Sequence, residues 1–284
     1  MFKNLSAGAI GVPAGMEEAV RLAKLGGFEG IEFSIGEAHK LAQEKGLDYV
    51  KGIFERSDIK PGGWGLPVRW QAPEEEFKKD LERLPELAEL GRELGCPRTF
   101  TWIPSWSDER PFEENFRWHV GRLRPVAEIL KEHGCLLGLE FLGPKTLREG
   151  HRFEFIHTLQ GMLELCEAIG TGNVGLLLDS WHWYTSHGRV EDILELRPEQ
   201  VVYVHINDAP KGVPIDEQVD NVRCLPGETG VIDLVGFLRG LKEIGYDGPV
   251  TPEPFSERVR KLPPEEAVRV TGEALDKVWR RAGL

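Results

Sequence analysis

Short apolar runs that resemble β-strands alternate with longer helical runs along the whole of this 284-residue chain. In the helical runs, such as 74–95 and 231–245, apolar residues recur at spacings of three and four. Strands separated by helices must run parallel, because the chain crosses back each time. The alternation therefore predicts an α/β fold. The candidate strands are 5–10, 28–33, 58–64, 98–103, 135–140, 173–179, 201–206 and 247–253.

Eight strand–helix units in one chain of this length fit a closed (β/α)₈ TIM barrel. No low-complexity tract or Gly/Ser linker divides the sequence, so we expect a single domain over residues 1–284. An open, doubly wound sheet is the alternative. It is disfavoured because no GxGxxG turn follows the first candidate strand.

Glycines mark the ends of several predicted helices. They stand just before the next strand, where a glycine can adopt the left-handed conformation that closes a helix. A last helix is expected at about 263–283, because Pro-Pro-Glu-Glu is a good helix start. The closing glycines are Gly95, Gly134, Gly170 and Gly245.

The formal net charge of −12 constrains the partners of the protein. Nucleic-acid binding depends on Lys and Arg that neutralise phosphates, and no cluster of these residues stands out. We therefore expect no nucleic-acid partner and a small neutral or metal-bridged substrate instead.

The cysteines and the N-terminus indicate the compartment. The four cysteines form no CxxC pair, and reduced, buried thiols in a cytoplasmic protein are the expected state. The sequence contains no signal-peptide pattern and no long apolar run, so no membrane association is expected. The cysteines are Cys96, Cys135, Cys166 and Cys224.

Four polar side chains end the last four candidate strands. In a (β/α)₈ barrel, reacting groups project from the carboxyl ends of strands into one shared mouth. A single acid at a strand end is more often a helix cap or a salt-bridge partner, but four in succession are hard to explain in that way. The four residues are Glu140, Asp179, His205 and Glu253.

Three carboxylates and one imidazole form a hard, oxygen-rich ligand set for a single divalent ion. Mn²⁺ is the ion we expect first, with Mg²⁺, Co²⁺ and Zn²⁺ as alternatives. The absence of thiolates argues against a purely structural zinc site.

Two further residues follow this set at a spacing of three. His182 follows Asp179, and Asp208 follows His205. We expect His182 to contact the substrate, with packing among the neighbouring aromatic residues as the alternative. We expect Asp208 to orient either the substrate or His205.

Two residues near other strand ends are also candidates for substrate contact. Trp102 could pack against the C–H face of a sugar, and the alternative is that it fills space between helices. Glu32 could touch the substrate or instead pair with Arg69.

Together these residues resemble the xylose-isomerase-like barrels of the sugar phosphate isomerase/epimerase family. Relatives include ketose 3-epimerases, hydroxypyruvate isomerase, inosose isomerase and inosose dehydratase. The stretch from Arg223 to Asp233 (RCLPGETGVID) also resembles this family. The resemblance implies that Glu140 and Glu253 act as acid/base catalysts, and that His182 and Arg223 contact the substrate.

The resemblance implies a metal-dependent isomerase or epimerase of a small sugar or polyol carbonyl compound. A proton would move through a metal-stabilised enediolate. Epimerisation, isomerisation and dehydration share the first step, so an inosose-type dehydratase remains an alternative. A non-catalytic sugar-binding barrel is a second alternative. Members of this family often form homodimers or homotetramers, which we expect here as well.

Overall fold

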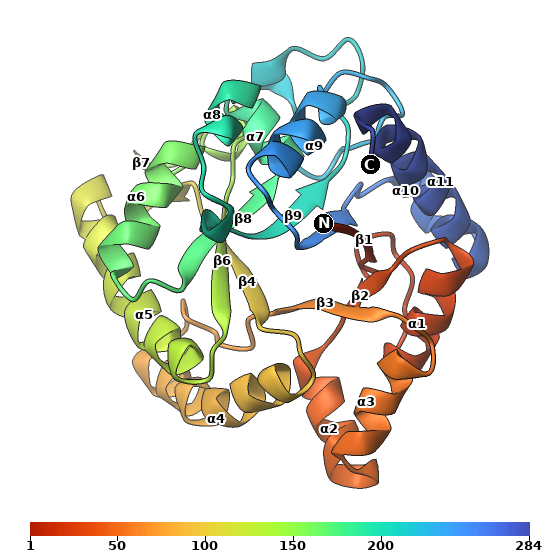
Figure 1. Cartoon of the computed structure of the whole chain (residues 1–284). Helices are drawn as coiled ribbons and strands as arrows, with labels where there is room; N and C mark the ends of the chain where they lie inside the picture. Colours follow the sequence, from red (N-terminus) through yellow and green to blue (C-terminus); the bar gives the residue numbers. More distant parts are fainter.

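The computed structural model describes residues 1–284, and its centre is a closed barrel of parallel strands. The strand order around the barrel is β1-β10-β9-β8-β6-β4-β3-β2, with helices forming an outer ring (Figure 1). The eight barrel strands are β1 (Phe2–Leu5), β2 (Gly30–Glu32), β3 (Lys60–Gly65), β4 (Arg98–Ile103), β6 (Leu136–Phe141), β8 (Val174–Asp179), β9 (Val201–Ile206) and β10 (Pro249–Pro252).

Two short strands lie outside the barrel, and helices connect the barrel strands. The outer pair, β5 (Trp106–Ser107) and β7 (Phe153–Glu154), is antiparallel. The α-helices are α1 (Met16–Leu25), α2 (Ile35–Lys45), α3 (Leu47–Glu55), α4 (Glu74–Glu93), α5 (Phe112–Glu132), α6 (Leu159–Ile169), α7 (Ser180–Thr185), α8 (Val190–Leu194), α9 (Leu234–Glu243), α10 (Glu257–Arg260) and α11 (Pro264–Ala282). The 3₁₀ turns are η1 (Lys145–Leu147), η2 (Pro198–Gln200) and η3 (Ile215–Glu217).

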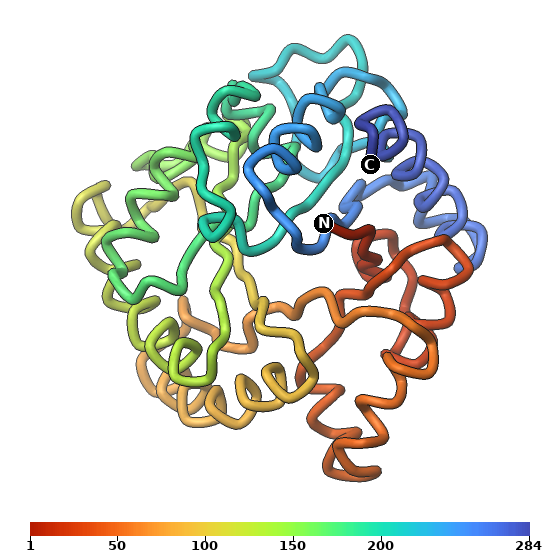
Figure 2. Tube along the Cα trace, viewed as in Figure 1, coloured from red at the N-terminus to blue at the C-terminus, as the bar shows by residue number.

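The two ends of the chain close the barrel. β1 pairs in parallel with β10 on one side and with β2 on the other. In Figure 2, the red start of the chain therefore lies beside the blue β10 segment. Closure leaves no free sheet edge, and it brings the carboxyl ends of all eight strands to one mouth.

The predicted (β/α)₈ barrel is confirmed, but the first predicted strand, 5–10, is wrong. The strand is β1 (Phe2–Leu5), and residues after Leu5 form a tight turn. Val12 N–H donates to the carbonyl of Ala7 at 2.9 Å, and Gly11 has a φ of +78°. The apolar residues of this turn pack in the core, which is why the run resembled a strand.

The glycines predicted to close helices do so. Gly95 and Gly134 both have a φ of +70°, and Gly170 and Gly245 have +77° and +84°. The left-handed backbone at each position ends a helix and directs the chain into the next strand. No helix in the chain is both long and apolar enough to cross a membrane.

Candidate metal centre

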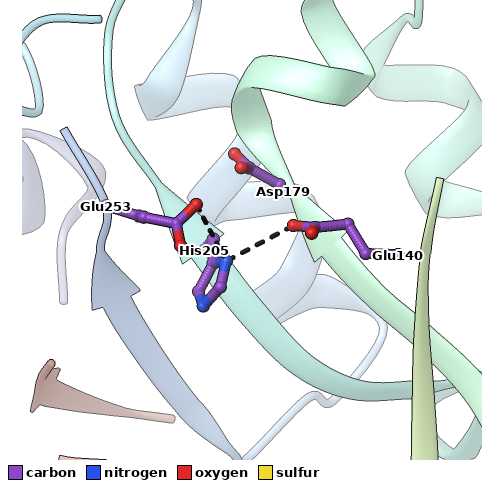
Figure 3. Close-up of side chains that lie close together, drawn as sticks. All are labelled: Glu140, Asp179, His205 and Glu253. Carbon is purple, nitrogen blue, oxygen red and sulfur yellow. Dashed lines mark ion pairs between the residues drawn. The ribbon is translucent and has the colours of Figure 1, made fainter. Parts of the chain in front are cut away.

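The four predicted ligands converge at the carboxyl mouth of the barrel. Glu140 lies on β6, Asp179 ends β8, His205 lies on β9 and Glu253 follows β10 directly. Each offers one ligand atom, and these atoms all lie within 4.8 Å of one another. Figure 3 shows the four side chains pointing toward a common centre from separate strands.

Strand register explains this convergence. Asp179 is aligned with His205 across the β8–β9 pair, and His205 is aligned with Thr251 across the β9–β10 pair. Glu253 is two residues beyond Thr251, so its side chain points to the same side of the sheet. Beyond a register shift between Leu176 and Leu177, the parallel pairing therefore places side chains from distant parts of the sequence at one level.

His205 is surrounded by carboxylates. Its Nδ1 lies 3.3 Å from Glu140 Oε1 and 3.4 Å from Glu253 Oε2 (Figure 3). Burial alone would lower the pKa of His205, but the two glutamates raise it well above its ordinary value. In the protein without a metal, a proton on this ring supplies the positive charge that the carboxylates require.

The two glutamates have opposite acidities. Burial raises the pKa of Glu140 to about 8, although the neighbouring His205 opposes the shift. Burial would raise the pKa of Glu253 as well, but His205 and Arg223 outweigh it and lower the value to about 2. One carboxyl group therefore favours the protonated form and the other favours the ionised form.

The donor set fits a divalent cation. Glu140 Oε1 and His205 Nδ1 are buried, and neither has a hydrogen bond of good geometry. Buried polar atoms without partners are costly, and a shared cation would satisfy both of them. Three oxygen donors and one nitrogen donor match the preference of hard or borderline divalent ions.

Arg223, predicted to contact the substrate, reaches into this cluster from the loop after β9. Its Nη1 donates to Asp179 Oδ2 at 2.8 Å and to Glu253 Oε2 at 2.9 Å. The guanidinium packs on the ring of Phe255, 4.6 Å from the ring centroid. Phe255 has a φ of +40°, a strained backbone for a non-glycine residue, which indicates a constrained loop at this point.

His182 lies at the edge of the cluster in a fixed orientation. Its Nδ1 accepts a hydrogen bond from Gly143 N–H at 3.2 Å, and its Nε2 lies 3.3 Å from Arg223 Nη2. Nε2 lies 3.9 Å from Asp179 Oδ2. Burial lowers the pKa of His182 to about 3, so the ring stays neutral. The structure thus brings His182 to the site as an uncharged ring.

Asn207 positions Asp179, a role that the sequence did not suggest. Asn207 Nδ2 donates to Asp179 Oδ1 at 3.0 Å, and Trp181 N–H donates to the same oxygen at 2.8 Å. Ser180 Oγ bonds both backbone polar groups of Asn207. These bonds occupy one carboxylate oxygen and leave Oδ2 to face Arg223. The only sequence signal was the position of Asn207, two residues after His205.

The prediction that Asp208 contacts the substrate or His205 does not match the structure. The Asp208 side chain is completely buried. Its carboxylate accepts hydrogen bonds at 2.7 to 3.0 Å from four backbone N–H groups of the loop that carries Arg223. Asp208 therefore holds this loop in place. The donors are Ala209, Thr229, Gly230 and Ile232.

Trp102 and Glu32 both face the mouth. Trp102 is aligned with Glu140 across the β4–β6 pair, and 48% of its surface is exposed. Glu32 accepts a hydrogen bond from Tyr203 OH at 3.3 Å. The alternative pairing of Glu32 with Arg69 is wrong, because Arg69 pairs with Asp80 and Glu76 on the outer side of the barrel.

The sequence is similar to a known protein family and to characterised enzymes. Residues 20–278 match the family model described as xylose isomerase-like TIM barrel. An inosose isomerase of Halalkalibacterium halodurans is 28% identical over 78% of this chain and 76% of its own length. A 3-dehydroshikimate dehydratase of Pseudomonas aeruginosa is 32% identical, but over only 50% of this chain and 21% of its own length.

Solved structures share the whole fold. A xylose isomerase domain protein from Alicyclobacillus acidocaldarius superposes with a TM-score of 0.88 and 32% identity, covering 100% of both chains. A structure of the IOLI protein with a bound zinc atom gives a TM-score of 0.79 at 23% identity, covering 98% of both chains. The second likeness concerns the fold alone.

Proposed function

Because this chain belongs to the xylose isomerase-like TIM barrel family, we propose that it is a divalent-metal-dependent isomerase or epimerase of a small polyhydroxy ketone. The observation that carries the proposal is the set of four ligand atoms from four strands within 4.8 Å of one another. The charge of such a set is costly to bury without compensation. Arg223 pairs with Asp179 and Glu253, and a bound cation would complete the compensation.

The substrate class follows from the relatives and from the composition of the site. Curated relatives that align over most of this chain include inosose isomerases, a ketose 3-epimerase and a putative hydroxypyruvate isomerase, and among these the inosose isomerases match at the highest similarity. We therefore take an inosose, a cyclic polyhydroxy ketone, as the first substrate to test. Its adjacent carbonyl and hydroxyl oxygens match a centre that holds one cation and has further donors beside it.

The metal would be held by Glu140, Asp179, His205 and Glu253. When bound, a divalent ion supplies Lewis acidity, which makes a C–H proton beside the substrate carbonyl easier to remove. We propose Mn²⁺ as the resident ion on the oxygen-rich donor set. Zn²⁺ is the first competitor to test, because the similar IOLI structure contains zinc.

Glu253 and Glu140 would transfer the proton. Before a metal binds, the pKa of Glu253 is lowered to about 2 and that of Glu140 is raised to about 8; as ligands of a cation both would be carboxylates. One carboxylate would take the proton from the carbon beside the carbonyl, and the second would return a proton from the other side. This pairing is also the argument against a barrel that only binds sugar.

His182 and Arg223 would orient the substrate oxygens. His182 Nε2 lies 3.9 Å from Asp179 Oδ2, 3.8 Å from Asp220 Oδ1 and 3.3 Å from Arg223 Nη2. Both side chains are buried, so their donors are fixed before a substrate arrives. Fixed donors reduce the reorganisation that binding would otherwise require.

Dehydration is a second candidate, because one relative is a 3-dehydroshikimate dehydratase. Loss of a hydroxyl from the carbon next to the deprotonated one would use the same first step. The products separate the two reactions. Dehydration lowers the substrate mass by one water and creates an ultraviolet chromophore, whereas isomerisation leaves the mass unchanged.

The proposal is tested by hydrogen exchange. Protein loaded with Mn²⁺ is incubated with an inosose and with several ketoses in D₂O. Deuterium should enter at the carbon beside the carbonyl of at least one substrate, and a chelator should abolish the incorporation. Exchange that continues at full rate after metal removal would contradict the proposal.

A further inference from the structure

A pocket of about 500 Å³ opens at the mouth beside the metal centre. It is formed by the carboxyl ends of β1, β2 and β3, on the half of the mouth that supplies no metal ligand. Two of its lining residues are acidic, Glu32 and Glu37, and none is Lys, Arg or His. Ser6 and Ser34 contribute hydroxyl groups to the lining.

Glu32 connects this pocket with the metal centre. It ends β2 and accepts a hydrogen bond from Tyr203 OH. The ring of Tyr203 lies 5.5 Å from the ring of His205, measured between centroids. A molecule bound at the metal centre therefore has Glu32 as its neighbour on the pocket side.

A buried polar network fixes the Glu32 carboxylate. Tyr203 OH donates to Glu32 Oε2 at 3.3 Å, and the same hydroxyl accepts from Asn4 Nδ2 at 2.8 Å and from Thr251 Oγ1 at 2.9 Å. Asn4 fits because Gly62 has no side chain, since a Cβ there would lie 2.1 Å from Asn4 Oδ1. The network holds Glu32 Oε2 in place and thereby also restricts the position of Glu32 Oε1.

Several charged side chains around the mouth are held by partners within the protein. Glu37 Oε1 accepts from Met16 N–H at 2.9 Å. Arg223 is bound to Asp179, Asp220 and Glu253. No basic side chain lines the pocket itself, so an anionic group that entered it would lose its hydration without gaining a cation there.

We propose that Glu32 and this pocket bind the hydroxyl groups of the substrate end remote from the metal, and that they select neutral polyhydroxy ketones over substrates with a carboxylate or phosphate group. The inference rests on the proposed function and adds a specificity determinant to it. A fixed carboxylate accepts hydrogen bonds from hydroxyls, and like charges placed together suppress the wrong partner.

Two ketones serve as probes, a neutral inosose and the carboxylate-bearing 3-dehydroshikimate. Their dissociation constants are measured by titration calorimetry on the full chain loaded with Mn²⁺. The wild-type protein should bind the inosose at least about tenfold more tightly than 3-dehydroshikimate. Glu32→Gln should weaken inosose binding about tenfold and reduce this preference, because it replaces a charged acceptor by a neutral amide.

A matched control and a kinetic readout separate selectivity from damage to the fold. Glu29→Gln makes the same substitution three residues earlier at an exposed position, and it should behave like the wild type. In the exchange assay, Glu32→Gln should raise KM for the inosose about tenfold with kcat within about threefold, and Mn²⁺ affinity should not change.

The outcomes distinguish this inference from the proposed function. Equal affinity of the wild type for both probes overturns the inference, as does unchanged selectivity in Glu32→Gln, even if deuterium exchange is normal. A wild-type protein that prefers the inosose in the predicted way but exchanges no deuterium contradicts the proposed function and supports the role of the pocket. Binding of neither probe overturns both.

Discussion

The two halves of the barrel mouth differ in regularity and in chemistry. On one half, β6, β8 and β9 are six residues long and almost entirely buried, although β10 has four residues and the β8–β9 register shifts once, between Leu176 and Leu177. On the other, β1 has four residues, β2 has three, and the β2–β3 register shifts between Ile31 and Glu32. The regular half holds the four candidate ligands, and the irregular half forms the pocket.

This difference indicates a division of labour within one fold. A metal centre needs side chains held at one level, which long paired strands supply. A pocket needs open space, which short strands and the turn after β1 leave at the mouth. Variants on each half should therefore affect different kinetic parameters.

The largest effect is expected on the regular half. Glu253→Gln removes the proposed base, so the rate of deuterium exchange should fall about a thousandfold or more. Mass spectrometry of the substrate measures the rate. Glu257→Gln, at an exposed position paired with Lys261, is the matched control and should retain normal exchange. Near-normal exchange in Glu253→Gln would show that Glu253 is not the base that removes the proton.

A buried histidine away from the metal centre, His119, is expected to make the stability of the protein depend on pH. His119 on α5 is enclosed by aromatic rings, and burial lowers its pKa from 6.5 to about 4. The imidazole is therefore neutral in the folded protein at neutral pH. The unfolded chain therefore binds the proton more tightly. The free energy of unfolding should therefore be highest above pH 6.5. It should fall as the pH is lowered toward 4, by about 3 kcal/mol at most.

Denaturant titrations between pH 4 and pH 7 measure this effect. His119→Phe should flatten the pH dependence, whereas His187→Asn, at an exposed position, should leave it unchanged. A profile of His119→Phe that is as steep as that of the wild type would show that His119 is not the titrating group.

An intermediate effect is expected at Asn207, which holds Asp179 Oδ1 at 3.0 Å. Asn207→Ala should weaken Mn²⁺ binding about 10- to 100-fold, because residues that orient ligands typically contribute this much. Calorimetric titration with Mn²⁺ measures the affinity. Asn221→Ala, on the same loop but exposed, should bind Mn²⁺ normally. Equal affinities in the two variants would contradict the positioning role.

The smallest effect is expected at Trp102, whose exposed ring lies at the mouth beside Glu140. Trp102→Ala should raise KM about fivefold by removing an aromatic surface, with little change in kcat or in melting temperature. Trp102→Phe should restore most of the affinity. A loss confined to kcat would indicate that the ring acts on the chemistry rather than on binding.

The sequence predicted the regular half of the mouth better than the irregular half. Ranges 135–140 and 201–206 nearly coincide with β6 and β9, because buried parallel strands are continuous apolar runs. β1 was missed because Lys3 and Asn4 interrupt its apolar pattern, and Asn4 is polar because it belongs to the network beneath Glu32.

Contacts made by loops could not be predicted from the sequence. The roles of Asn207 and Asp208 depend on the path of the chain after β9, and local pattern does not determine that path. Asp208 shows the limit most clearly. Its spacing from His205 suggested a place in the site, whereas its hydrogen bonds stabilise the loop that carries Arg223.

The central claim is that four side chains from four strands hold one cation, and anomalous scattering tests it most directly. Crystals grown with Mn²⁺ should show one strong anomalous peak, bound by Glu140, Asp179, His205 and Glu253 at distances of about 2.0 to 2.3 Å. A map with no peak among these residues, or with a peak held by other side chains, would contradict the account.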